Sequence, residues 1–350
     1  MTTPPEQTRS EADPTVAPAP RRASLSARPA PAIEAEGLER TYPGGLRAVD
    51  GVDLTVAEGE IYGFLGPNGA GKSTTVRILT TLLRPTGGVA RVAGFDVVTQ
   101  ATKVRSRIGV ALQEAALDPL MTGRELLELQ GALHALPRSQ ARERARDLLG
   151  RVELEDAADR RLATYSGGMR RRLDLALALV HRPPVLFLDE PTTGLDPVSR
   201  AALWREVRLL NGDGTTVFLT TQYLEEAEQL AGRVGIIDNG RIVAEGTPDE
   251  LKARIGEPAL HVQLADPGRQ DEARRLLAPL GACENHEHPG LLVRAADGAR
   301  AIAPVVRALD EAGIEVDAVE VEHPSLDDVF LAVTGHRAET AGDGAAHLKI

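Results

Sequence analysis

Nine consecutive residues have the types and the spacing to hold a phosphate group. They are Gly66, Pro67, Asn68, Gly69, Ala70, Gly71, Lys72, Ser73 and Thr74. The segment matches G-x-x-x-x-G-K-[ST] at each fixed position, a pattern in which the lysine reaches the β- and γ-phosphates and the hydroxyl is a ligand of Mg²⁺. Its glycines let the backbone curl so that successive N–H groups point at phosphate oxygens. The sequence therefore predicts a nucleoside triphosphate site.

Two adjacent carboxylates, Asp189 and Glu190, follow an apolar run at 184–188. Such a run is typical of a buried parallel strand, and ligands of open α/β sheets bind at the carboxyl ends of the strands. One carboxylate can hold Mg²⁺ while the other accepts a proton from water. The alternative is a solvated pair of charges, but a phosphate loop in the same chain favours function.

A third segment, Ser166-Gly167-Gly168, opens a helix predicted to run to about residue 180. Serine is a good N-cap, and bare backbone N–H groups at a helix N-terminus can bind an anion. A plain capped helix is the alternative, because Ser-Gly-Gly alone is weak evidence. We interpret the following arginines, 170–172, as a mostly solvated helix face.

Tyr42 lies before the phosphate loop, near the turn Pro43-Gly44. An exposed aromatic ring there could stack on a nucleobase. An ordinary half-buried strand tyrosine is the alternative, and position alone does not choose between the two.

The elements that must position these residues alternate between strands and helices, which indicates an α/β fold. The predicted strands are 33–42, 52–56, 60–66, 108–112, 184–188, 216–221, 234–237 and 241–244. The last two are joined by Asn239-Gly240, a strong tight-hairpin signal. The predicted helices are 74–83, 125–135, 138–150, 166–180, 198–210 and a short one after the capping box at Thr247.

A second pattern of predicted strands and helices begins after residue 256. Strands at 260–264, 282–286, 291–294 and 316–321, with helices at 270–280 and 299–312, give the order β-α-β-β-α-β of a ferredoxin-like fold. A final helix is expected at 325–333. We therefore divide the chain into a Pro/Ala-rich disordered tail (1–32), a nucleotide domain (33–256) with a helical subdomain at about 114–170, a small α+β domain (257–335) and a disordered tail (336–350). We expect the small domain to have a regulatory or dimer-contact role.

Composition narrows the class of protein. The formal net charge of −11 argues against binding nucleic acid. The single cysteine allows no intrachain disulfide, which fits a reducing cytoplasm. No apolar stretch approaches the roughly 20 residues that span a bilayer, so a membrane role would need a partner.

Taken together, the motifs resemble those of the ATP-binding subunits of ABC transporters over about residues 33–250. The loop at 66–74 is similar to Walker A, 185–189 to Walker B with Glu190 after it, and Ser166-Gly167-Gly168 to the signature. Gln113 matches the Q-loop, Asp196 the D-loop, and Gln222 the position of the switch histidine. The resemblance places Tyr42 where these proteins stack adenine.

A narrower resemblance is to the daunorubicin/doxorubicin-resistance type of ABC ATPase. It is carried by YSGGMRRRL at 165–173, TTQYLE at 220–225, and SLDDVFL at 325–331. This type pairs an ATPase with a separate membrane permease and exports drugs. Two positions depart from the wider family: Met169 replaces the usual glutamine of the signature, and Gln222 replaces histidine. A glutamine amide donates a hydrogen bond but carries no charge, so turnover should lack the pH dependence of histidine.

The resemblance implies ATP and Mg²⁺ as cofactors and a head-to-tail dimer of two copies. Ser73, Gln113 and Asp189 would hold Mg²⁺, and Glu190 would polarise the attacking water. Lys72 and Gln222 would contact the γ-phosphate, and the signature of one copy would donate to the ATP of the other. The chain would lie on the cytoplasmic face of the membrane through its permease. Alternatives are export of a lipid, polysaccharide or ion, or an ABC ATPase acting on ribosomes or DNA.

Overall fold

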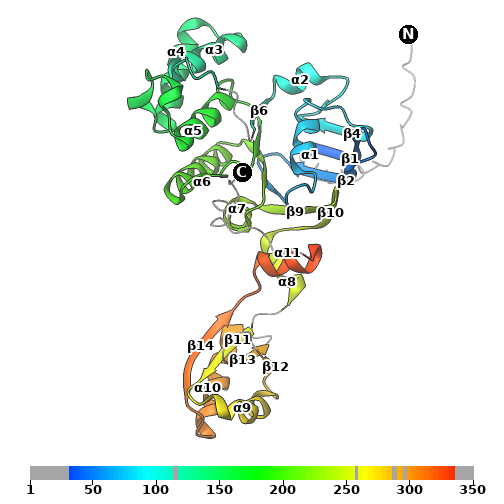
Figure 1. Cartoon of the computed structure of the whole chain (residues 1–350), viewed down its shortest axis with the longest axis vertical. Helices are drawn as coiled ribbons and strands as arrows, with labels where there is room; N and C mark the ends of the chain where they lie inside the picture. Colours follow the sequence, from blue (N-terminus) through cyan, green and yellow to red (C-terminus); the bar gives the residue numbers. More distant parts are fainter. Residues whose placement is uncertain (1–30, 113–116, 257–258, 286–289, 295–297, 336–350) are drawn as a thin grey trace, which may run out of the picture.

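The computed structural model describes residues 31–112, 117–256, 259–285, 290–294 and 298–335. Figure 1 shows a larger upper body and a small domain joined below it. The upper body contains a central sheet, a second sheet and a helical subdomain. Gln113, residues 1–30 and 336–350 of the predicted tails, and parts of two loops of the small domain lie outside the described residues. The last two residues of the predicted N-terminal tail, Pro31 and Ala32, belong to the first strand, and Ala32 is buried.

The centre of the upper body is a six-stranded sheet in the order β10-β9-β3-β8-β7-β6. Strands β3, β6, β7, β8 and β9 are parallel, and the hairpin strand β10 is antiparallel to β9. The bounds are β3 Ile61–Leu65, β6 Ile108–Ala111, β7 Val185–Asp189, β8 Thr216–Thr221, β9 Arg233–Asp238 and β10 Arg241–Gly246. Every residue of β3, β7 and β8 is buried, as their apolar runs predict for central parallel strands.

A second, antiparallel sheet has the order β2-β1-β4-β5 and lies beside α1 (Figure 1). Its strands are β1 Pro31–Thr41, β2 Arg47–Ala57, β4 Gly87–Val92 and β5 Phe95–Asp96. One continuous core joins this sheet, α1 (Lys72–Leu79) and the central strands. The aromatic rings of Tyr62, Phe64 and Phe187 pack around Phe218 in that core.

The helical subdomain contains α3 Gly123–Leu133, α4 Arg138–Arg151 and the beginning of α5 Gly167–Ala178. Thr122 and Glu125 form the predicted capping box at the start of α3. Two short 3-10 helices, η1 Glu155–Ala157 and η2 Leu162–Thr164, connect α4 to α5. Leucines and alanines of these helices share a core with the faces of β7 and β8.

The remaining helices of the upper body are α2 Ala101–Arg105, α6 Pro197–Gly212, α7 Leu224–Leu230 and α8 Pro248–Ile255. The sequence patterns did not predict β4, β5, α2 or α7. The predicted helix 74–83 is wrong at its end, because α1 stops at Leu79 and Thr81 takes a positive φ of 67°. Among the described residues, no helix is long and apolar enough to span a membrane.

The small domain has the predicted β-α-β-β-α-β order. Its antiparallel sheet runs β12-β13-β11-β14, which is the ferredoxin-like arrangement with the first and last strands at adjacent positions. Helices α9 and α10 share a core with the strands. The bounds are β11 Ala259–Leu264, α9 Gln270–Leu277, β12 Ala282–Asn285, β13 Leu291–Arg294, α10 Ile302–Glu311 and β14 Val316–Glu322, with 3-10 turns η3 Pro267–Arg269 and η4 Gly298–Ala301.

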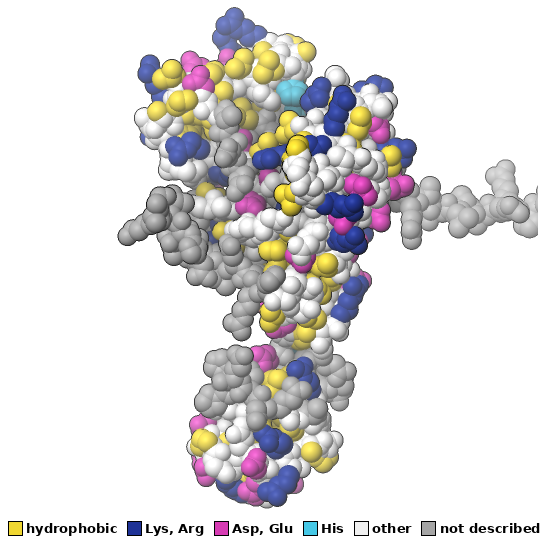
Figure 2. All heavy atoms as spheres, turned by 45° about the vertical axis from the view of Figure 1, so that its right-hand side comes forward, with side chains coloured by type: hydrophobic (Ala, Val, Ile, Leu, Met, Phe, Trp, Pro, Cys, Tyr) yellow, Lys and Arg dark blue, Asp and Glu magenta, His cyan; other side chains and the backbone are white. Residues whose placement is uncertain are grey.

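The last described helix, α11 Leu326–Thr334, does not pack in the small domain with which it was grouped. It returns to the upper body and lies against α8 (Figure 1). Leu326, Val329 and Phe330 are at most 2% exposed and share a core with residues of β3, α7 and α8. The small domain is therefore inserted in the chain between α8 and α11. Figure 2 shows it as a separate lobe below a narrow neck.

Candidate nucleotide-binding and hydrolysis site

Residues 66–71 form a tight loop between the end of β3 and the start of α1, and residues 72–74 are the first residues of that helix. A Cβ on Gly66 would lie 2.4 Å from the carbonyl oxygen of Ile237, and one on Gly71 would lie 2.3 Å from that of Ala48. Gly71 also has a φ of 110°. The fold therefore requires glycine at both positions. Gly69 has open space around it, but its φ of 83° also favours glycine.

The N-terminus of α1 is available to an anion. Gly71 is its N-cap, and among the described residues no side chain caps this helix. The first helical residues, Lys72 and Ser73, thus present backbone N–H groups and the positive end of the helix dipole toward the loop. These features fit the triphosphate of ATP.

Lys72 is only 4% exposed and lies inside the loop. Its Nζ donates to the carbonyl oxygens of Gly66 (2.7 Å) and Pro67 (3.2 Å) and lies 3.4 Å from Oε1 of Glu190. The structure thus brings the predicted phosphate-binding lysine and the predicted general base together. A buried ammonium held by loop carbonyls and one carboxylate is well placed to bind phosphate oxygens.

Ser73 and Asp189 converge on one point, as the sequence predicts for two ligands of Mg²⁺. The Ser73 hydroxyl donates to Oδ1 of Asp189 (3.2 Å), and the hydroxyl of Thr220 donates to the same oxygen (2.5 Å). Hydroxyl and carboxylate oxygens are the ligands that Mg²⁺ prefers. Thr220 was not among the predicted site residues; its place near the end of β8, next to β7, is the sequence signal that could have identified it.

Glu190 is 7% exposed and follows β7 directly. Its φ of 46° lies in the left-handed region, which is uncommon for a residue with a side chain. Its N–H donates to the carbonyl and hydroxyl oxygens of Thr220, both at 3.1 Å. Its Oε2 accepts from the Thr193 hydroxyl at 3.4 Å. This turn aims the carboxylate at Lys72 rather than along the strand.

Two further predicted residues border the loop. The Tyr42 hydroxyl lies 3.4 Å from that of Thr74, and Arg40 lies over the ring of Tyr42 at 5.0 Å. Gln222 follows β8, and its Oε1 is buried without a hydrogen-bond partner. Because phosphate oxygens accept hydrogen bonds, the Nε2 of this amide, and not the orphaned Oε1, is the atom that could donate to a γ-phosphate. The structure does not describe Gln113.

The Ser-Gly-Gly segment is not part of this site within one copy. Ser166 caps α5 by accepting from the N–H of Met169 (3.2 Å), and α5 and α1 lie on opposite sides of the central strands (Figure 1). A Cβ on Gly168 would meet Ser199, which Asp196 holds at the start of α6. The signature and D-loop segments are therefore neighbours, at a distance from Lys72.

The interpretation of the arginines at 170–172 as a solvated face is wrong for the middle one. The Arg171 side chain is only 11% exposed and donates to backbone carbonyls near β6 and β7. Arg172 is partly buried and donates to Val152, whereas Arg170 is exposed. The signal for burial was Asp174, a carboxylate three residues later in an otherwise apolar stretch.

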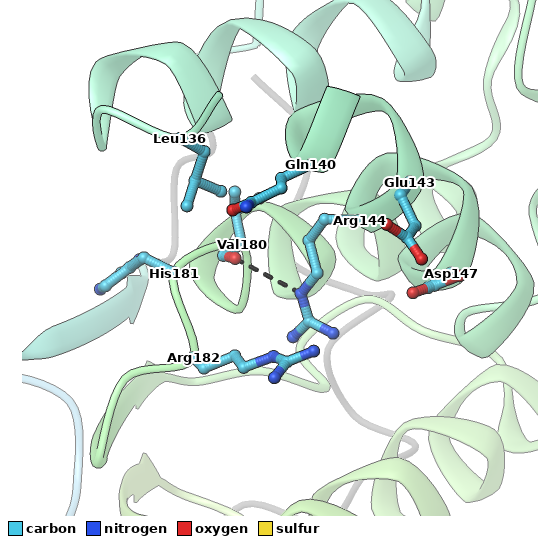
Figure 3. A pocket seen from close by; sticks show the side chains of 8 residues that line it. All are labelled: Leu136, Gln140, Glu143, Arg144, Asp147, Val180, His181 and Arg182. Atoms are coloured by element: carbon cyan, nitrogen blue, oxygen red, sulfur yellow. Dashed lines mark hydrogen bonds between the residues drawn. The ribbon is translucent and has the colours of Figure 1, made fainter. Parts of the chain in front are cut away.

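A cavity of about 400 Å³ lies beside α4 and is lined by none of the predicted site residues. In Figure 3 Arg144 reaches across it, and its Nε donates to the Val180 carbonyl oxygen (3.3 Å). At its edge the ring of His181 stacks on that of His134, with centroids 3.8 Å apart. Burial, and secondarily His134, lowers the pKa of His181 to about 4.

Two family models match the chain. The model described as "ABC transporter" covers residues 49–193, and the model described as "ATP-binding protein DrrA1-3-like, C-terminal domain" covers residues 246–334. The second match begins before the predicted boundary at 257. It spans α8 through α11, the two helices that pack together at the base of the small domain.

The chain is 53% identical to the daunorubicin resistance ATP-binding protein DrrA3 of Streptomyces coeruleorubidus over 304 residues, 87% of this chain and 96% of the relative. The chain belongs to the ABC transporter ATP-binding family. It is also 50% identical to the daunorubicin/doxorubicin resistance ATP-binding protein DrrA of Streptomyces peucetius, over 90% of this chain and 96% of that protein.

A solved ABC cassette gives the same assignment from the fold. The dimeric post-hydrolysis state of an ATP-binding cassette with ADP and Pi has a TM-score of 0.58 and 30% identity, covering 61% of this chain and 98% of that one. As a member of the family the chain is an ATPase, and ATP is its nucleotide. The resemblance drawn from the six motifs is confirmed at the level of family, fold and activity.

Proposed function

We propose that the chain is the ATP-hydrolysing subunit of an exporter and that it drives efflux of a drug or antibiotic through a separate membrane permease. The observation that carries the proposal is the convergence of Lys72, Ser73, Asp189 and Glu190 in a chain that is about half identical to drug-resistance ATP-binding proteins. The chain would lie on the cytoplasmic face of the membrane, bound to that permease.

Hydrolysis follows from the geometry of these residues. ATP would bind with its phosphates on the N-terminus of α1 and on Lys72, and with adenine against Tyr42. Mg²⁺, held by Ser73 and Asp189 with Gln113, would neutralise charge on the β- and γ-phosphates. Glu190 would then orient and deprotonate water, so that catalysis consists mainly of positioning and electrostatics.

The signature segment requires a second copy. Since Ser166–Gly168 lies away from the loop of its own chain, its free N–H groups are placed to meet the ATP of a partner in a head-to-tail dimer. Gln222 and Gln113 would respond to the γ-phosphate at that interface. The dimeric cassette among the similar structures supports this arrangement.

Purification of the tagged full chain from native membranes tests the proposal. We expect a polytopic membrane protein to be captured, and ribosomes or DNA in its place would overturn a transport role. Inverted vesicles that contain both proteins should then accumulate doxorubicin with ATP. Vesicles made with Glu190→Gln should not. ATP hydrolysis without doxorubicin uptake would exclude doxorubicin as the cargo.

A further inference from the structure

Arg171 joins the signature helix to the backbone of the hydrolytic site in the same chain. It lies five residues after Ser166, on α5. Its Nε donates to the carbonyl oxygen of Pro191 (2.9 Å), and one terminal nitrogen donates to that of Asp189 (2.8 Å). The other terminal nitrogen donates to the carbonyl oxygen of Leu112 and to Asp174. All three guanidinium nitrogens therefore bond to backbone.

The three carbonyls lie where regular pairing between strands stops. The ladder between β6 and β7 ends at the pair Ala111 and Leu188, and Leu112 and Asp189 come next. Among the described strands, β6 is at the edge of its sheet. Buried carbonyl groups need hydrogen-bond donors. The planar guanidinium of Arg171 supplies the donors that backbone N–H groups would have supplied if β6 and β7 had stayed paired.

Two of these bonds bracket Glu190. Asp189 and Pro191 are its immediate neighbours, and Glu190 itself has the left-handed φ of 46°. Backbone in this region persists only where its surroundings hold it. Arg171 donates to the carbonyl oxygens on either side of Glu190 and so fixes the direction in which the Glu190 carboxylate leaves the backbone.

The charge of Arg171 is balanced at the same place. Burial lowers its pKa, and the carboxylates of Asp174, Asp189, Glu226 and Glu190 oppose that effect. The side chain is thus a buried cation among carboxylates, two of which belong to the proposed hydrolytic site. Arg170, one residue earlier, is exposed and donates to the carbonyl oxygen of Tyr165.

We propose that Arg171 is a positioning residue for ATP hydrolysis, which holds the turn at Glu190 and the backbone before Gln113 in register with the signature helix. The inference rests on the proposed ATPase mechanism and adds a residue to it. Because α5 carries the signature, a shift of that helix on binding a partner's ATP would be passed through Arg171 to the chain's own Glu190.

The test compares Arg171→Lys with Arg170→Lys in the full chain. Both changes keep the charge and remove the guanidinium fork, but only the first removes the bonds around Glu190. Lysine offers one point of donation and cannot reach three carbonyls. We expect kcat of Arg171→Lys to fall about tenfold or more, within the range of positioning effects, while the Kd for ATP changes less than about threefold. Arg170→Lys should keep the wild-type kcat.

Equal kcat values for the two variants would overturn the inference. So would a loss of ATP binding and of thermal stability in proportion to kcat, because a merely structural arginine would give that result. If Arg171→Lys does not fold, Arg171→Gln is measured by the same criteria. An inactive wild-type chain would refute the proposed function instead, so the two failures are distinguishable.

Discussion

At the scale of single residues, the geometry assigns different tasks to two adjacent carboxylates. Asp189 is held by Ser73 and Thr220, whereas Glu190 turns away from the strand toward Lys72. The first arrangement suits a metal ligand and the second a group that acts on water. The left-handed turn between them separates the two tasks.

Replacing Glu190 by glutamine should therefore lower kcat by about 10²-fold or more, the usual size of a general-base effect. ATP should still bind, because the loop, Lys72 and Asp189 are unchanged. Calorimetric titration with ATP and a phosphate-release assay measure the two quantities. Glu225→Gln, whose side chain is 61% exposed, is the control. Near-normal hydrolysis by Glu190→Gln would contradict the assignment.

Much of this site could be predicted because its chemistry depends on consecutive residues. A phosphate loop and a carboxylate pair are each read from one short segment, and parallel strands bring their carboxyl ends together. Arg171 and Thr220 could not be found in this way. The local signals, which are Asp174 after Arg171 and the place of Thr220 near the end of β8, indicate burial or proximity to the site. They do not indicate the partners, which are backbone carbonyls and a carboxylate far along the chain. Three adjacent arginines on a helix look alike until the packing of the helix is known.

At the scale of elements, stacked histidines join the end of α3 to the segment after α5. The Nε2 N–H of His181 donates to the Ile108 carbonyl oxygen (3.0 Å), and Nδ1 is buried without a partner. Burial, with the nearby His134, depresses the pKa of His181 from 6.5 to about 4. A neutral ring is thus favoured in the fold, while the unfolded chain takes up a proton below about pH 6.5.

The free energy of unfolding should consequently contain a contribution that is complete above about pH 6.5 and is lost as the pH falls toward 4. Relative to His181→Phe, which can stack but does not titrate, the wild type should lose about 1–2 kcal/mol between about pH 6.5 and 4.5, after allowance for partial exposure. Urea unfolding at several pH values measures the difference. Parallel curves for wild type and His181→Phe would refute this.

Helix α11 is the other element whose role is set by packing. Its sequence motif was recognised, and the C-terminal family model includes it. Contiguity along the chain, however, does not reveal which core a helix joins, and α11 packs in the core that contains residues of β3, α7 and α8. Phe330 is 1% exposed, in a core that also contains Leu65, just before the phosphate loop, and Leu224, just after Gln222. α11 thus supports the two segments that flank the γ-phosphate position.

Phe330→Ala should destabilise the docking of α11 by about 3–5 kcal/mol, the usual cost of removing a buried phenylalanine side chain. Hydrogen exchange of α11 and α7 amides measures the loss directly. Leu331→Ala, next in the chain but 40% exposed, is the matched control and should have little effect. Equal protection of α11 in both variants would show that Phe330 does not hold this helix.

At the scale of the whole molecule, the chain leaves the nucleotide domain at α8 and comes back at α11. These two helices pack against each other, so the entry and the exit of the small domain are close together. The match of the C-terminal family model, 246–334, includes both. The small domain can therefore be removed in two ways that differ only in whether α11 remains.

A linker of Gly and Ser in place of 257–324 should leave a stable ATPase, because α11 still covers Leu224, Val234 and Leu251. Deletion of 257–350 should destabilise the nucleotide domain, since each fully buried aliphatic side chain that becomes exposed costs about 1.5–3 kcal/mol. Thermal unfolding and phosphate release distinguish the variants. If the small domain serves the permease, the linker variant should hydrolyse ATP yet fail to accumulate doxorubicin in inverted vesicles. Full uptake by that variant would exclude a role of the small domain in export.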